Sequence, residues 1–117
     1  EKDREFELAP FGMIGLETSL ALVITHLVAP GVISWERAVE LMAVAPRRIL
    51  RLERVALEPG STADLTVIDP DAAWTVDPAD FLSKATNSGF VGAELTGRAT
   101  DVYVAGYATL EDGAIVE

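Results

Sequence analysis

The sequence predicts an α/β chain in which helices come first and β-strands follow. Two observations indicate this order: apolar residues recur at helical spacing up to residue 52, and short β-type runs separated by turn residues occupy residues 63–116. There are no internal repeats and no low-complexity segments. Because helices and strands do not alternate, we expect two layers belonging to different structural units, residues 1–52 and 53–117.

Three helices are predicted in the first part. The first covers residues 15–29 and ends at Pro30-Gly31, a helix-stopping dipeptide. Ser34 is the expected N-cap of the second helix, with Glu36 in its first turn, where the helix dipole favours a carboxylate. Pro46 is expected to end the second helix and to begin a short third one through about residue 52.

Each of the first two helices should bury one face. The buried face of the first consists of apolar residues three or four apart: Leu16, Leu20, Val23, Ile24 and Leu27. The expected inner side of the second helix consists of Val39, Met42 and Ala43.

The second part reads as short strands joined by turns. Residues 63–68 and 73–76 are β-type runs on either side of a predicted turn at residues 69–71. A loop with one helical turn near residues 78–82 follows and extends to Gly97. Two tight-turn dipeptides then predict short hairpins near the C-terminus: Ala105-Gly106 and Asp112-Gly113.

Composition excludes several classes of function. The formal net charge of −10, with nine Lys plus Arg, argues against nucleic acid and disfavours an anionic membrane surface. The absence of cysteine excludes disulfides, thiolate metal sites and a cysteine nucleophile within this chain. No apolar run approaches the roughly eighteen residues that span a bilayer, and there is no signal-peptide pattern. We therefore expect a cytoplasmic protein.

Isolated titratable residues give no convincing active site. His26 is the only histidine and has no Cys or His partners, so a structural or surface role is expected rather than zinc binding. Asp64 and Asp69 lie five apart in a strand-turn segment, which places them on opposite faces, so turn formation and solvation are expected. Arg47 and Arg48 could bind an anion, but exposed arginines are routine surface residues. Trp35 and Trp74 are expected to serve in packing.

The loop Pro10-Phe11-Gly12 is the best candidate for a binding site. Pro10 restricts its own φ and that of the residue before it, whereas Gly12 and Gly15 allow a tight turn or a close approach. A loop of restricted geometry at a helix start can present N–H groups to an anionic ligand. The alternative is an ordinary loop-to-helix connection in which Phe11 anchors the loop in the core.

Two motifs carry a family resemblance: Ala9-Pro10-Phe11-Gly12 with Gly15-Leu16-Glu17, and the Gly-x-x-Ala-Asp-Leu-x-x-x-Asp stretch from Gly60. With them the sequence resembles bacterial dihydroorotases of the amidohydrolase superfamily over essentially all 117 residues. The stretch from Gly60 marks the superfamily, and the first motif is the narrower sign of dihydroorotase. Other matching segments are residues 46–50, residues 74–78 and Gly97-Arg98 with the tail after it. Related enzymes often show Asn-Thr-Pro-Phe where this chain has Asn87-Ser88-Gly89-Phe90.

The resemblance implies a fold and a place within it. Such enzymes are several times longer and are built around a (β/α)₈ barrel. Residues 1–52 would then be the last loop and helices of the barrel, and residues 53–117 would be the C-terminal part of a β-sandwich assembled from both chain termini. We therefore expect a C-terminal fragment whose N-terminal part, with most of the barrel, is missing, and which has no activity alone.

The resemblance also implies a zinc-dependent activity. Dihydroorotases interconvert (S)-dihydroorotate and N-carbamoyl-L-aspartate in de novo pyrimidine biosynthesis; zinc activates the attacking hydroxide and an aspartate moves the proton. That aspartate belongs to an Asp-His-Ala-Pro-His motif that would lie just upstream of Glu1, so no catalytic residue and no metal ligand is expected in this chain. By resemblance, Phe11 would pack beside the pyrimidine ring of the substrate, and the N–H of Gly12 would contact a ring oxygen or the carboxylate.

Two alternatives remain. One is another cyclic amidohydrolase, namely a hydantoinase, dihydropyrimidinase or allantoinase, which should differ at Ala9-Pro10-Phe11-Gly12. The other is a non-catalytic dihydroorotase-like partner of aspartate transcarbamoylase. The expected partners are a small-molecule substrate, the missing N-terminal part, and either a second copy in a homodimer or aspartate transcarbamoylase.

Overall fold

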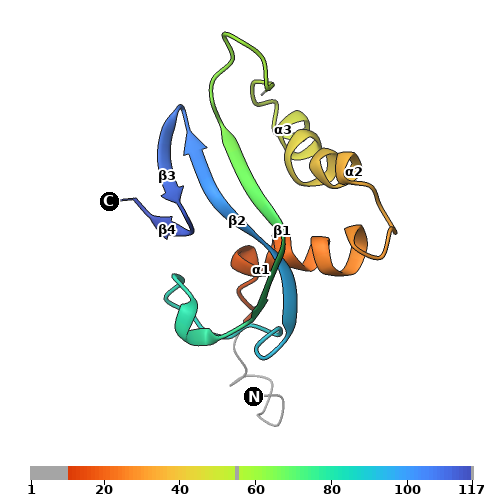
Figure 1. Cartoon of the computed structure of the whole chain (residues 1–117), viewed down its shortest axis with the longest axis vertical. Coiled ribbons are helices and arrows are strands. Elements are labelled where there is room, and N and C mark those ends of the chain that lie inside the picture. The colour runs from red at the N-terminus through yellow and green to blue at the C-terminus, as the bar shows by residue number, and fades with distance from the viewer. Residues whose placement is uncertain (1–10, 55, 117) are drawn as a thin grey trace.

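The computed structural model describes residues 11–54 and 56–116, in which helices precede strands as predicted (Figure 1). The first helix runs as α1 (Leu16–Val23) and continues without a break as the π-helical turn η2 (Ile24–Val28). The second runs as α2 (Trp35–Val39), the π-helical turn η3 (Glu40–Val44) and α3 (Ala45–Ile49). Among the residues that the structure describes, no helix is long and apolar enough to cross a membrane.

The signals that begin and end these helices act as predicted, with one exception. Gly31 has φ +74° just after η2, and the hydroxyl oxygen of Ser34 accepts a hydrogen bond from the N–H of Arg37 at 3.3 Å. Pro46, however, does not separate two helices. It lies in the first turn of α3, and the chain enters that turn directly from the π-helical turn η3, whose last residue is itself helical. The predicted third helix is thus the end of the second.

The strands form one antiparallel sheet in the order β1-β2-β3-β4. Its two long strands are β1 (Leu65–Thr75) and β2 (Glu94–Val104), and its short strands are β3 (Tyr107–Glu111) and β4 (Ala114–Ile115). Leu65 pairs with Tyr103 and Thr75 with Glu94, so residues 76–93 form a long connection that closes at the Thr75–Glu94 pair. This connection contains η4 (Pro78–Asp80), the helical turn that the sequence predicted. The predicted extension of the loop to Gly97 is wrong, because β2 begins at Glu94.

The predicted turn at residues 69–71 does not divide the segment into two strands, because β1 runs through it. That part of the prediction is wrong. Asp69 pairs with Arg98 and Ala73 with Thr96, so three residues of β1 stand opposite Gly97 alone. A carboxylate oxygen of Asp69 accepts the N–H of Asp71 at 3.0 Å, which is the turn chemistry that the sequence indicated. In a strand held by a long partner, this chemistry produces a bulge rather than a reversal.

Both predicted hairpins are confirmed. Ala105 and Gly106 have φ +51° and +84° between β2 and β3, and Asp112 and Gly113 have φ +49° and +77° between β3 and β4. Two consecutive positive φ values match the right-handed twist of the flanking strands.

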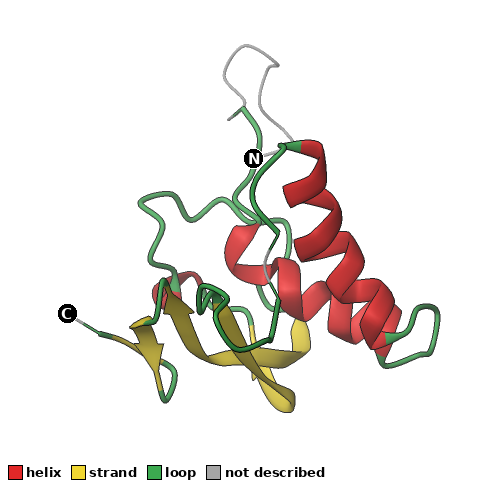
Figure 2. Ribbon diagram, turned by 90° about the horizontal axis from the view of Figure 1, so that it is seen from above, coloured by secondary structure: helices red, strands yellow, loops and turns green. Residues whose placement is uncertain are grey.

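The helices lie on one side of the sheet, and α1 packs against β2 (Figure 2). Ala21 of α1 shares a buried cluster with Val76 and Leu95, next to which the partly buried Trp74, Phe81 and Phe90 pack. The two predicted units are therefore in direct contact, and the boundary after residue 52 stays a prediction.

The second helix uses a different face from the one predicted. Ala38 is buried, whereas Val39, Met42 and Ala43 are exposed, so the predicted inner side is wrong for this chain. Their apolar pattern is helical, but no described element covers that face. Periodicity identifies the apolar face of a helix without identifying what packs on it.

Candidate functional site

The candidate loop lies directly before α1. Pro10 falls outside the described residues; Phe11, which follows it, has 92% of its surface exposed. Phe11 therefore does not anchor the loop in the core formed by the described residues. Gly12 has φ +71°, and a Cβ built on it meets no atom within 4 Å. Within this chain, Gly12 is needed for its backbone conformation, not for lack of space.

This loop is attached to the long connection between β1 and β2. The side-chain amide of Asn87 donates to the carbonyl oxygen of Gly12 at 2.9 Å, and the N–H of Ile14 donates to the carbonyl oxygen of Asn87 at 3.3 Å. Between them, the sulfur of Met13 lies 3.0 Å from the position that a Cβ of Gly89 would take. Gly12 of the candidate loop and the two residues that follow it thus lie against residues 87–89.

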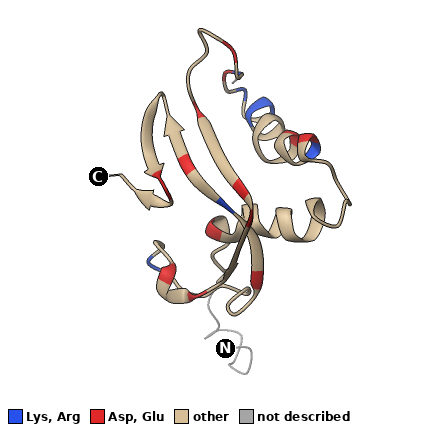
Figure 3. Cartoon of the chain, in the orientation of Figure 1, with Lys and Arg blue, Asp and Glu red and all other residues tan. Residues whose placement is uncertain are grey.

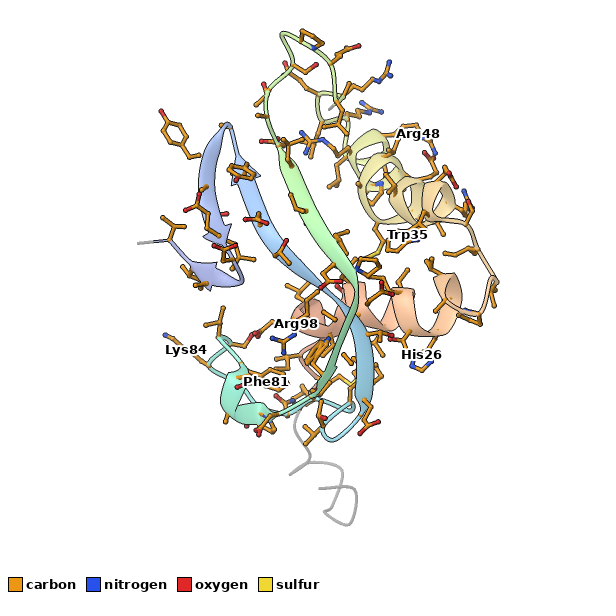
Figure 4. The ribbon with its side chains drawn as sticks, viewed as in Figure 1. His26, Trp35, Arg48, Phe81, Lys84 and Arg98 are labelled. Carbon is orange, nitrogen blue, oxygen red and sulfur yellow. The ribbon has the colours of Figure 1, made fainter. Side chains whose placement is uncertain are left out.

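Glu17, in the first turn of α1, contacts the same connection at a second place, residues 82–83. Its carboxylate accepts the N–H of Leu82 at 2.9 Å, the N–H of Ser83 at 3.2 Å and the hydroxyl of Ser83 at 2.6 Å. These bonds, the Ser83 hydroxyl first, lower the pKa of Glu17 below its ordinary value because they stabilise the ionised form. Phe81, beside this contact, packs against the core (Figure 4).

No metal centre forms from the described residues, where no group of three or more His, Cys, Asp or Glu side chains converges. His26 is exposed on η2 and projects away from Phe81 and Arg98 (Figure 4). The described residues therefore form no zinc site, either next to the Phe11–Gly12 loop or elsewhere.

The two aspartates have separate structural roles; Asp69 has the predicted turn chemistry, whereas Asp64 makes contacts with residues distant in the sequence. One carboxylate oxygen of Asp64 accepts the N–H of Ala105 at 2.8 Å, and the other lies 3.8 Å from the guanidinium of Arg47. A carboxylate oxygen of Asp69 accepts the N–H of Asp71 within the bulge of β1. Arg48 pairs with Glu40 at 3.3 Å. Basic side chains gather on the second helix, while acidic ones are spread over strands, loops and helices (Figure 3).

The tryptophans differ in their surroundings. Trp74 donates to the carbonyl oxygen of Gly97 at 3.2 Å and carries the guanidinium of Arg98 4.2 Å from its ring centre, which fits the predicted packing role. Trp35 is 39% exposed and lines an open hollow of about 640 Å³ beside the β1 bulge. None of the residues that line this hollow belongs to the Phe11–Gly12 loop.

Glu17 and Asn87 lie within family motifs of the sequence but are not among the site residues predicted from it. Their contacts join residues 65 to 75 positions apart. The signal that could have drawn attention to them is the length of the connection, since long loops in compact domains are commonly functional.

Comparison with known proteins identifies the relatives of this arrangement, although no protein-family model matches the chain. A dihydroorotase from Pelotomaculum thermopropionicum is 48% identical over 98% of this chain, and one from Chlorobaculum tepidum is 50% identical over 88%. The structure of an L-hydantoinase (dihydropyrimidinase) from Arthrobacter aurescens matches 93% of the chain with a TM-score of 0.85 and 35% identity.

These matches cover only part of each relative. The chain spans 27% and 24% of the two dihydroorotases and 25% of the hydantoinase. The sequence match to the two dihydroorotases nevertheless extends over most of this chain, at 48–50% identity. The chain therefore belongs to the dihydroorotases, within the cyclic amidohydrolases, and corresponds to about a quarter of such a protein.

Proposed function

We propose that the chain is part of an active dihydroorotase that interconverts (S)-dihydroorotate and N-carbamoyl-L-aspartate in de novo pyrimidine biosynthesis. The observation that carries the proposal is the 48–50% identity with two dihydroorotases over nearly the whole chain. The loop that was the narrower sign of this family is also where the structure exposes Phe11 beside the positive-φ Gly12.

In this proposal, residues 1–52 close a (β/α)₈ barrel and residues 53–117 contribute strands to a β-sandwich. The exposed apolar side chains support such a placement, because apolar patches of this kind are rare on monomeric soluble proteins. On the second helix and just after it they include Val39, Leu41, Met42, Val44, Ile49 and Leu50. The rest of the enzyme would cover them.

The zinc expected for such an enzyme does not fit the residues of this segment. His26 stands alone, and no cluster of metal-binding side chains forms among the described residues. A zinc site of this type needs several converging nitrogen or oxygen ligands, which we assign to the rest of the protein. The contribution of this chain would be to bind and orient the substrate.

The proposed substrate contacts are made by Phe11 and Gly12. An apolar ring that is 92% exposed at the start of a helix offers a surface on which a planar pyrimidine ring can lie. The backbone of Gly12 is open on the side where a Cβ would project, so a ligand can approach it closely.

A hydantoinase is the second candidate, because the L-hydantoinase structure matches with a TM-score of 0.85. Turnover measured with the purified full-length, zinc-loaded protein separates the candidates. We expect hydrolysis of dihydroorotate and not of 5-substituted hydantoins. The reverse preference would establish a hydantoinase, and activity on neither substrate would support the non-catalytic alternative.

Variants of the same enzyme test the loop. Phe11→Ala should weaken substrate binding by about 1–3 kcal/mol if the ring packs on the substrate, since this is the value of burying a large apolar side chain. The matched control is Leu57→Ala, which truncates an apolar residue 88% exposed outside the loop. Equal Michaelis constants for both variants and the wild type would show that Phe11 does not contact substrate.

Gly12→Ala is tested in the same way against Gly31→Ala. The two glycines have φ +71° and +74°, and a Cβ at either position meets nothing within 4 Å. The conformational cost is thus matched, and only Gly12→Ala should raise the Michaelis constant while zinc content stays constant. Parallel effects of the two variants would assign the change to folding.

A further inference from the structure

The connection between β1 and β2 is held in place mainly by contacts with other segments, because it has little regular secondary structure of its own. Residues 76–93 contain only the short turn η4, yet the connection is folded against the start of α1 (Figure 1). Its base is closed by the N–H of Val76 bonding the carbonyl oxygen of Ala93 at 2.9 Å and the N–H of Gly92 bonding that of Val76 at 2.9 Å. Val76 itself is buried.

Two polar attachments join this connection to the segment that carries the candidate loop. At one, Asn87 donates to the carbonyl oxygen of Gly12 and accepts from the N–H of Ile14, so a single residue fixes both sides of Met13. At the other, the carboxylate of Glu17 accepts all three of its bonds from Leu82 and Ser83.

The two attachments act on one short segment. Gly12 and Glu17 are five residues apart, and the segment between them passes from the loop into the first turn of α1. Glycine at positions 12 and 15 gives this segment many accessible conformations, so bonds from outside are needed to select one of them. Asn87 bonds directly to Gly12, whereas Glu17 fixes the helix start behind it.

We infer that Asn87 and Glu17 are positioning residues, which hold Phe11 and Gly12 in the conformation that binds substrate. This inference rests on the proposed function. Neither side chain contacts the substrate in this scheme; each acts through the loop. Loss of either attachment widens the range of loop conformations, and the fraction of enzyme ready to bind substrate then falls.

The test uses the full-length, zinc-loaded enzyme. Asn87→Asp is the informative variant because it keeps the shape of the side chain and replaces the amide donor by an acceptor that repels the carbonyl oxygen of Gly12. We expect the Michaelis constant for dihydroorotate to rise about 2–10-fold, the range that corresponds to one lost hydrogen bond, with zinc content and melting temperature near wild type. Thr86→Ala, a truncation in the same connection, serves as control.

Glu17→Gln should raise the Michaelis constant less than Glu17→Ala, because glutamine keeps one acceptor for the N–H groups of Leu82 and Ser83. The control is Glu36→Gln, another exposed glutamate in the first turn of a helix, whose pKa is likewise lowered, in its case by the Ser34 hydroxyl. We expect Glu36→Gln to leave the kinetics unchanged.

A double-mutant cycle identifies the route of the effect. If Asn87 acts through the loop, Asn87→Asp should have a smaller effect in a Phe11→Ala background than in the wild type. Wild-type kinetics for Asn87→Asp, or fully additive effects in the cycle, would overturn the inference while leaving the proposed function intact. Failure of both Asn87→Asp and Asn87→Ser to fold would also overturn it, because the residue would then serve the fold. Absence of dihydroorotate turnover by the wild-type enzyme would instead reject the proposed function.

Discussion

The contact between α1–η2 and the sheet requires glycine at position 97, because Ile24 occupies the space that a side chain there would need. Gly97 is buried in β2, opposite the bulge of β1, and has φ +93°. A Cβ at this position would lie 2.4 Å from Cδ1 of Ile24, 3.1 Å from its Cγ2 and 3.2 Å from its Cβ. Moving the tip of the isoleucine side chain would not relieve the two inner contacts.

The expected cost of Gly97→Ala has two parts. The left-handed backbone conformation costs an L-residue about 1–2 kcal/mol, and overpacking a well-filled site costs about 1–3 kcal/mol, so the sum is about 2–5 kcal/mol. Gly106→Ala is the matched control: Gly106 has φ +84° in the β2–β3 turn, but a Cβ there meets nothing within 4 Å. Only the conformational part, about 1–2 kcal/mol, applies to it.

Thermal unfolding of the full-length enzyme measures the difference. We expect the melting temperature to fall in the order wild type, Gly106→Ala, Gly97→Ala. Ile24→Val removes Cδ1, the atom nearest to the new Cβ, so Gly97→Ala should cost less in that background. Equal destabilisation by the two alanine variants, or no relief from Ile24→Val, would show that Ile24 does not press on Gly97.

Three further outcomes are expected. Expressed alone, residues 1–117 should lack a cooperative melt, because many large apolar side chains are exposed; a reversible transition of a monomer with full near-UV circular dichroism would contradict this. Zinc titrated into the chain alone should bind no more tightly than about micromolar, because carboxylates and one histidine are weak ligands for it; a tight stoichiometric site would contradict this and direct attention to His26. Folding lowers the pKa of the Glu17 carboxyl. Above pH 4.5 the wild type should therefore have a higher melting temperature than Glu17→Gln, and this difference should disappear as the pH falls through the native pKa. A difference in melting temperature that is independent of pH would refute the role of the Glu17 charge.

Local signals predicted the local structure well. The first helix followed from apolar spacing, although Leu16 and Leu27 of its predicted buried face are exposed and only Ile24 of that face is fully buried. The two C-terminal hairpins followed from dipeptides that adopt positive φ, Ala105-Gly106 and Asp112-Gly113. Asp69 was correctly assigned turn chemistry, but whether such a turn reverses the chain or makes a bulge depends on the partner strand. No pattern within residues 69–71 contains that information.

Tertiary context decided the remaining features. The exposed apolar face of the second helix has a helical pattern, yet none of the described residues covers it. In the candidate site, Phe11 and Gly12 were assigned from family resemblance, and their contact with substrate stays a prediction. Asn87 and Glu17 were not, because their roles depend on contacts across at least 65 residues. Such contacts are set by topology rather than by any local pattern.

The sequence Asn87-Ser88-Gly89-Phe90 shows how these contacts relate to a local difference from similar enzymes, which often carry Asn-Thr-Pro-Phe. Proline at the third position would restrict the backbone of the connection. Any Cβ there, including that of proline, would also lie 3.0 Å from the sulfur of Met13, closer than the two atoms can comfortably pack. Glycine removes the restriction and lets Met13 lie directly on the connection, between the two hydrogen bonds that Asn87 makes. In this chain the bonds of Asn87 and the contact of Met13 thus link the conformation of residues 87–89 directly to that of Gly12.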